Sequence, residues 1–401
     1  MNQSRVSAAA VLLPLLMAAC PLWKSGAPVR VPLLLDHGRL MVAGEARLPD
    51  RSWLPVRLWI DTGSPSLAVS PGLAARLASS GDAAAAFGLR LAGMELDLSS
   101  SGPPRSDLPA WIFAATGADA TLPATVLSQY RVTFDLPGRN LLLASPKGRH
   151  GSGPGDRAAG KVAASVNRST GIVAVTAYLG DRPVRLALDL GASFSFLDAD
   201  LIGDILARHP DWPRFEGSAG TANMWGWFFP DEEDWEVLRS DQLRLGDQQI
   251  EDFAFVALPR ASVGGLGPWY SRKTAIPVTG FLGSNAFRDF VLEIDYAGGS
   301  VSLTRGASSG HHDLDALPIG VRPEEDGGYS VAAVAHRAGQ PLLQGLEPGD
   351  RLLSVDGHSV RGLTMGGLDA LMAGAPGDRH RLRLEREGRD FELDASVLRL
   401  P

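Results

Sequence analysis

The feature that most constrains the fold is an internal repeat. Residues 55–63 read PVRLWIDTG and residues 183–191 read PVRLALDLG, so six of the nine positions are identical. Each copy is a run of β-forming residues that ends in an aspartate and then a glycine turn. A repeated segment of this kind indicates that the chain contains two copies of one structural unit.

A second pair of similar segments leads to the same conclusion. Residues 126–143 and residues 286–303 each predict an alternating strand, a tight turn opened by an aspartate, and another strand. Because both pairs occur in the same order, we expect two similar β lobes, the first lobe at residues 29–147 and the second lobe at residues 161–306. Residues 148–160 (GRHGSGPGDRAAG) are polar and glycine-rich, which suits a linker between the lobes.

The composition is that of a folded protein of two or three domains. Of the 401 residues, 45% are hydrophobic and 21% are charged, which excludes disorder and coiled coil. The 46 glycines and 28 prolines indicate many turns and favour β structure. A net charge of -7 argues against nucleic acid as a partner, since phosphate binding needs a basic face. The single cysteine and the scattered histidines predict no disulfide, no metal site and no cofactor.

With its flanking residues, the repeat resembles the catalytic loops of aspartic peptidases of the retropepsin and pepsin type. Residues 61–64 (DTGS) follow the apolar strand at 58–60 and match the family's loop motif, and residues 189–191 (DLG) match its second copy. Residues 280–283 (GFLG) resemble the segment that threads the family's psi-shaped loop. The resemblance implies a mainly β fold with two tandem retropepsin-like β-barrel lobes.

The resemblance also implies an aspartic endopeptidase whose two carboxyls, Asp61 and Asp189, activate a water molecule. Like charges about 3 Å apart cannot both ionise, so one carboxyl stays protonated while the other is charged. The charged carboxylate acts as general base on the water, and the protonated one donates to the carbonyl oxygen of a peptide or protein substrate. The supporting residues that the motif implies are Thr62, Gly63, Ser64 and Gly191.

Two positions depart from the family pattern. In the family, a Thr or Ser hydroxyl after each aspartate bonds across to the opposite lobe; Thr62 can do this and Leu190 cannot. We therefore expect a looser catalytic pair, with chemistry slower by about 10²-fold per ångström of misplacement. Pro123 stands where the second lobe has Gly283, so we also expect an altered psi-shaped loop in the first lobe. These departures leave a second function open, that of a catalytically degenerate fold acting as a peptide-binding envelope lipoprotein.

The second lobe contains a candidate for a substrate-covering flap. Within residues 215–239, glycines alternate with aromatic residues, and Trp225, Gly226 and Trp227 form the predicted tip. Aromatic side chains at a hairpin tip can cover a bound peptide. A packed core loop is the alternative interpretation of the same pattern.

The segment 313–401 is similar to a bacterial PDZ domain, a small, partly open β-barrel with short helices. Residues 345–357 (GLEPGDRLLSVDG) are the most specific stretch of this resemblance. The predicted elements are strands at 329–336, 379–386 and 390–398 and a short helix at 368–372.

A PDZ domain binds an extended peptide by adding it as a strand beside a carboxylate-binding loop. The residues that match this loop are Ile319, Gly320 and Val321. Pro318 precedes them and removes one N–H, so binding of an internal peptide segment is as compatible with this loop as capture of a C-terminal carboxylate. The resemblance thus implies a second site for a peptide ligand.

The first 20 residues (MNQSRVSAAAVLLPLLMAAC) resemble the signal peptide and lipobox of a bacterial lipoprotein. Arg5 precedes an apolar run that has the length of a signal-peptide core and is short for a bilayer span. The resemblance implies removal of residues 1–19 and lipid attachment at Cys20, with enough acyl chains to anchor the protein in a membrane. An ordinary secretory signal with an incidental cysteine is the alternative. We expect an exported protein of the bacterial cell envelope, lipid-anchored and facing the periplasm.

Overall fold

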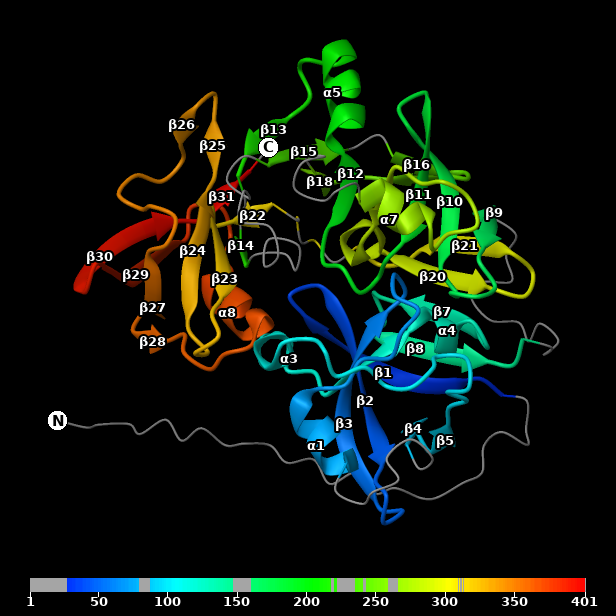
Figure 1. The fold of residues 1–401 in the computed structure, drawn as a ribbon. Helices are drawn as coiled ribbons and strands as arrows, with labels where there is room; N and C mark the ends of the chain where they lie inside the picture. Colours follow the sequence, from blue (N-terminus) through cyan, green and yellow to red (C-terminus); the bar gives the residue numbers. More distant parts are fainter. Residues whose placement is uncertain are drawn as a thin grey trace.

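The computed structural model describes most of the chain after the N-terminal segment. The described residues are 27–78, 87–146, 160–217, 220–221, 235–240, 243–258, 266–308, 310, 312 and 314–400. The predicted signal peptide at 1–19, the lipidation site Cys20, most of the linker and the flap residues Trp225, Gly226 and Trp227 lie outside the described residues. Figure 1 shows the first lobe in blue and cyan, the second lobe in green and yellow, and the C-terminal domain in orange and red.

The two lobes share one continuous antiparallel sheet. Three of its strands come from the first lobe and three from the second, and the central pair joins Thr133 to Glu293. The order is β1 (Val29–Asp36), β8 (Asn140–Ala144), β7 (Arg131–Asp135), β20 (Phe290–Asp295), β21 (Ser300–Arg305) and β9 (Lys161–Val166). Alternate residues of β7 and β20 are buried, as the sequence pattern predicts for a sheet with one covered face.

Each lobe adds a further set of strands and short helices. The first lobe contains β2 (Arg39–Arg47), β3 (Trp53–Asp61), α1 (Pro71–Ala78), β4 (Gly88–Leu91), β5 (Met94–Glu95), α3 (Ala110–Thr116), β6 (Ala120–Pro123) and α4 (Ala124–Leu127). The second lobe contains β10 (Val173–Leu179), β11 (Arg182–Leu188), β12 (Ser195–Asp198), α5 (Ala199–Arg208), β13 (Arg214–Glu216), β14 (Gly220–Thr221), β15 (Glu236–Ser240), β16 (Leu243–Leu245), β17 (Gln248–Ile250), β18 (Phe253–Leu258), α7 (Leu266–Ser271), β19 (Gly280–Leu282) and the 3₁₀ helix η4 (Ser284–Phe287).

The internal repeat is visible as two matching parallel strand pairs. In the first lobe, β3 pairs with β6, and in the second lobe β11 pairs with β19. A short helix, α4 or η4, follows the second strand of each pair. The expectation of an altered loop at Pro123 is confirmed for the lost donor, because the Gly283 N–H donates to the Ser195 hydroxyl (3.0 Å) and Pro123 has no N–H. It is wrong for the strand pairing, which extends to Asp61 opposite Pro123. The physical reason is that Gly283 has φ -81° and Pro123 has φ -80°, an angle that a proline ring adopts readily.

The C-terminal domain has its own core, and most of its strands belong to a sheet separate from that of the lobes, while the strands at residues 336–337 and 340–341 join the sheet of the lobes. Its strands and helix are β22 (Asp315–Ala316), β23 (Ile319–Pro323), β24 (Tyr329–Val334), β25 (His336–Arg337), β26 (Gln340–Pro341), β27 (Arg351–Val355), β28 (His358–Ser359), α8 (Met365–Met372), β29 (Arg379–Arg386), β30 (Arg389–Ser396) and β31 (Leu398–Arg399). Ile319, Val331, Leu352, Leu368 and Leu382 belong to one buried cluster between α8 and the separate sheet. The mainly β class predicted from the sequence is confirmed, with the predicted strands and helix in place.

The C-terminal domain packs against both lobes. On the second lobe, β13 pairs with β25, and Phe215 and Trp235 share a buried cluster with Ala335 and Leu400. On the first lobe, α8 lies beside α3 (Figure 1). Asp36 at the end of β1 accepts hydrogen bonds from the Thr364 hydroxyl (2.8 Å) and the Gly366 N–H (2.9 Å) at the start of α8. In the described part of the chain, no helix is long and apolar enough to cross a membrane.

Candidate active site

The two repeated aspartates stand in the same local geometry. Asp61 is the last residue of β3, and Asp189 directly follows β11. The Gly63 N–H donates to Asp61 Oδ1 over 3.1 Å, and the Gly191 N–H donates to Asp189 Oδ1 over 3.1 Å. Each carboxyl is therefore held by the turn that its own glycine makes.

The structure brings the two aspartate loops into contact. A Cβ atom on Gly63 would lie 2.3 Å from Asp189 Oδ2, and a Cβ atom on Gly191 would lie 3.1 Å from the Asp61 Cα. A side chain at position 63 would therefore overlap the second carboxyl. The sequence predicts that these four residues form one site, and the structure places them together at the contact between the lobes.

Hydrogen bonds of Thr62 connect the two loops. The Thr62 hydroxyl donates to the Leu188 carbonyl (3.0 Å) and accepts from the Leu190 N–H (2.8 Å). Leu190 thus takes part through its backbone, while its side chain is buried in the hydrophobic core. The supporting role expected of Thr62 is visible as these two contacts, whereas the Ser64 hydroxyl accepts from the Ser66 N–H (3.4 Å) within its own turn.

A third connection was missed by sequence reasoning. Trp59 Nε1 donates to the Gly191 carbonyl over 3.0 Å and is buried. In the second copy of the repeat the matching position is Ala187, which cannot make the reciprocal bond. Within the repeat this tryptophan is one of three differences between the copies, and that difference was the available signal. Three hydrogen bonds therefore join the loops although Leu190 supplies no hydroxyl.

The two carboxyls do not titrate as ordinary surface acids. Burial, together with the charge of Asp189, raises the pKa of Asp61 to about 8. Burial also raises the pKa of Asp189, while hydrogen bonds from Tyr270, Gly191 and Ala192 act in the opposite direction. The charge of Asp189 raises the pKa of Asp61, while the hydrogen bonds at Asp189 favour its own charged form. Asp189 is therefore the carboxyl that ionises first, and Asp61 is the one that keeps the shared proton.

Two further residues near the carboxyls come from α7 and the turn after it. The Tyr270 hydroxyl donates to Asp189 Oδ2. The ammonium of Lys273 faces Asp61 closely enough to lower the pKa of that carboxyl. Nothing in the motif pointed to either residue, because both lie more than 80 positions from Asp189 or from Asp61 along the chain. They form the polar surroundings of the site on the side of the second lobe.

The predicted peptide-binding residues of the C-terminal domain lie on the strand β23 and not in a loop, because their backbone pairs with β24. Ile319 is buried, and Gly320 and Val321 pair with β24 on one side. On the other side, Gly320 pairs in parallel with Gly220, and Val321 pairs with Thr221. The edge that would receive a peptide therefore holds β14, a two-residue strand of this same chain, which also lies against α8.

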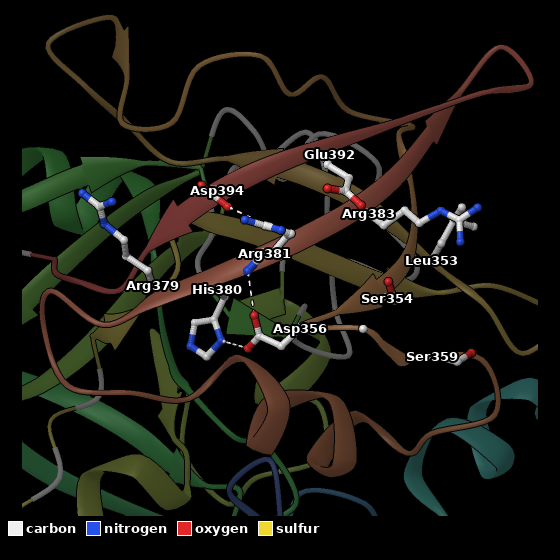
Figure 2. A pocket seen from close by; sticks show the side chains of 11 residues that line it. Leu353, Ser354, Asp356, Ser359, Arg379, His380, Arg381, Arg383, Glu392 and Asp394 are labelled. Carbon is white, nitrogen blue, oxygen red and sulfur yellow. Dashed lines mark hydrogen bonds and ion pairs between the residues drawn. The ribbon is translucent and has the colours of Figure 1, made fainter. Parts of the chain in front are cut away.

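Two cavities lie away from the carboxyls. One, of about 340 Å³, is lined by residues of all three parts of the chain, including His37, Ser193 and Asp369. Figure 2 shows the other, a polar hollow of about 900 Å³ on β27, β29 and β30, where Asp356 accepts from the Arg381 N–H and contacts His380. No group of three or more His, Cys, Asp or Glu side chains in the described ranges could hold a metal ion.

Comparison with known proteins gives one family match. Residues 343–386 match the PDZ domain model. The chain therefore carries a PDZ domain at its C-terminal end, as the sequence predicts. No curated protein matches the chain. Among solved structures, an aspartic proteinase from Irpex lacteus is similar, with a TM-score of 0.40 and 10% identity over 70% of this chain and 98% of that chain.

Proposed function

We propose that this protein is an aspartic endopeptidase whose catalytic pair is Asp61 and Asp189. The observation that supports the proposal is the meeting of two repeated carboxyl loops, each held by its own glycine N–H, in which Asp189 alone also accepts a side-chain hydrogen bond from Tyr270. Two acids with separated pKa values are what general acid and general base catalysis need in one site. A protein that only binds peptides does not require this pair.

The chemistry follows from the two protonation states. The Asp189 carboxylate takes a proton from a bound water while the water oxygen bonds to the peptide carbonyl carbon, and Asp61 gives its proton to the carbonyl oxygen. In the breakdown step the proton on Asp189 passes to the amide nitrogen, Asp61 recovers a proton from one hydroxyl, and the C–N bond breaks. The products are a carboxylic acid and an amine, and both aspartates return to their starting states.

We further propose that the PDZ domain presents a peptide or protein substrate, and that Cys20 anchors the protein by lipid in the bacterial envelope, facing the periplasm. A peptide that adds to β23 must displace β14 from Gly320 and Val321. Substrate binding at the PDZ domain would thus act on a segment of the second lobe. The flap role of Trp225, Gly226 and Trp227 belongs to the same proposal.

The alternative is a catalytically degenerate, peptide-binding envelope lipoprotein. The observation in its favour is that both oxygens of Asp189 already accept hydrogen bonds within the protein, from Gly191 and from Tyr270. A carboxylate so engaged has less capacity to orient a water molecule than a carboxylate with one free oxygen.

The test is digestion of an unfolded protein substrate by the purified chain between pH 3 and pH 9. We expect cleavage by the wild type and loss of cleavage in Asp61→Asn and in Asp189→Asn. The matched control is Asp135→Asn, which alters a turn aspartate that accepts from the Gly138 N–H and lies outside both aspartate loops. Cleavage that survives either substitution in the pair would overturn the assignment. Peptide binding without cleavage at any pH would favour the alternative.

A further inference from the structure

Tyr270 is a buried side chain that the sequence motifs do not explain. It lies on α7, is 1% exposed, and its hydroxyl donates to Asp189 Oδ2. Its ring packs against Phe281 on β19, with ring centroids 5.2 Å apart. Its backbone carbonyl accepts from the N–H groups of Lys273 (2.7 Å) and Thr274 (2.8 Å). Because contacts fix both the ring and the backbone of Tyr270, the hydroxyl is held in its position beside Asp189.

The contact falls where the second loop lacks polar side chains. The first loop reads Asp-Thr-Gly-Ser from residue 61, and the second reads Asp-Leu-Gly-Ala from residue 189. Both hydroxyls of the first loop are thus absent from the second, and Ala192 can donate only its N–H. Tyr270 supplies a hydroxyl from outside the loop, 81 residues further along the chain.

We propose that Tyr270 is a positioning residue that keeps the negative charge of the pair on Asp189 and leaves the proton on Asp61. The inference rests on the proposed function, since it assigns the base and the acid of that reaction. A hydrogen bond to an ionised carboxylate stabilises the charged form far more than the neutral form. No equivalent side-chain donor reaches Asp61 from the described residues, so the two carboxyls become unequal.

The other charged groups around the pair act in a defined way. The Lys273 ammonium lowers the pKa of Asp61. The positive charges of Arg105 and Arg272 in turn lower the pKa of Lys273. The N–H groups of Gly191 and Ala192 act on Asp189 together with Tyr270. Lys273 lowers the pKa of Asp61 less than the N–H groups of Gly63 and Ser64 do. At Asp189, the Tyr270 hydroxyl lowers the pKa more than the N–H groups of Gly191 and Ala192 do.

Tyr270 remains a donor over the working range of pH. Burial and the neighbouring Asp189 charge raise the pKa of its hydroxyl well above 10. The phenol therefore keeps its proton wherever the pair is singly ionised, and it takes no part in proton transfer. Its effect is on the energy of the charged Asp189 alone.

The test is Tyr270→Phe in the full chain, which removes the hydroxyl and keeps the ring against Phe281. The acid limb of the kcat/KM profile reports the first ionisation of the pair. Without the donor, we expect the apparent pKa of this limb to rise by about one unit, so that kcat/KM on the limb falls about tenfold at a given pH. The alkaline limb should change little. The matched control is Tyr296→Phe, another buried tyrosine of the second lobe, whose hydroxyl has no hydrogen-bond partner among the described residues.

A second measurement keeps the test independent of turnover. Carbon-13 NMR titration of protein labelled at the aspartate carboxyls follows the ionisation directly, and Asp189→Asn assigns the signal. We expect the Asp189 midpoint to rise by about one unit in Tyr270→Phe and to stay in place in Tyr296→Phe. An unchanged midpoint, or an unchanged acid limb in an active enzyme, would overturn the role of Tyr270. A shifted midpoint in a protein that never cleaves peptide would overturn only the proposed function.

Discussion

The hydroxyl of Thr62 is the group on which the contact between the two aspartate loops depends most directly. Thr62 is 2% exposed, and its hydroxyl serves both the Leu188 carbonyl and the Leu190 N–H. Thr62→Val keeps the shape of the side chain and leaves both backbone groups without this partner. An unpaired buried polar group costs about 1–3 kcal/mol, so the two together cost about 2–6 kcal/mol of the free energy of unfolding.

Thr62→Ser is the matched control, because it keeps the hydroxyl and removes one methyl group, at a cost of about 1 kcal/mol. Urea unfolding of the full chain, followed by tryptophan fluorescence, measures the free energy of unfolding of each variant. We also expect kcat/KM of Thr62→Val to fall by about 10²-fold for each ångström by which the carboxyls separate. Equal stability of the Val and Ser variants, with equal kcat/KM, would refute the conclusion that this hydroxyl joins the loops.

Three further predictions concern the proton of Asp61, the Trp59 side chain and the carboxylate of Asp36. Because the pKa of Asp61 is about 8, its proton is present below that pH and lost above it. We therefore expect kcat/KM to stay constant up to about pH 7 and to fall about tenfold per pH unit above about pH 8. A fall that begins below about pH 6 would contradict the assignment of the proton to Asp61. Trp59→Phe removes the donor to the Gly191 carbonyl and should cost about 1–3 kcal/mol in urea unfolding, with Trp53→Phe, a half-buried tryptophan on the same strand, as the comparison. Asp36→Ala removes the acceptor of the Thr364 hydroxyl and the Gly366 N–H. Amide hydrogen exchange in α8 should therefore become at least tenfold faster, while exchange in β20 stays unchanged. An unchanged exchange rate in α8 would show that Asp36 does not hold the PDZ domain.

The PDZ groove shows what a local prediction can miss. The sequence predicts a carboxylate-binding loop at residues 319–321, whereas these residues lie in strand β23 and pair with β24. The family match covers residues 343–386, which contain β27, β28, α8 and β29. The strand that pairs with the outer edge of β23 is β14, which lies about 100 residues earlier in the chain, at Gly220 and Thr221. Two residues of strand carry no periodic pattern, so no reading of the sequence could have paired them with β23.

Pro123 and Leu190 show that a prediction made from the side chain can miss what the backbone does. Each was judged by the side chain alone, one as a ring that restricts φ and one as a residue without a hydroxyl. In the structure, Pro123 meets a backbone angle that suits it, and Leu190 is linked through its N–H. Backbone angle and backbone hydrogen bonding are common to all residue types, and so they leave little trace in the amino-acid pattern.

The sequence by itself determined the repeat, the two aspartates at the ends of matching strands, the glycine turns that hold them and the identity of the C-terminal domain. These features are local, because alternation of apolar residues and glycine turns act over a few positions. Only the tertiary structure decided that Trp59 bonds Gly191, that Tyr270 bonds Asp189 and that β14 fills the edge of β23. Each of these contacts joins residues 80 or more positions apart, and such contacts depend on how the lobes pack and not on any pattern within a strand.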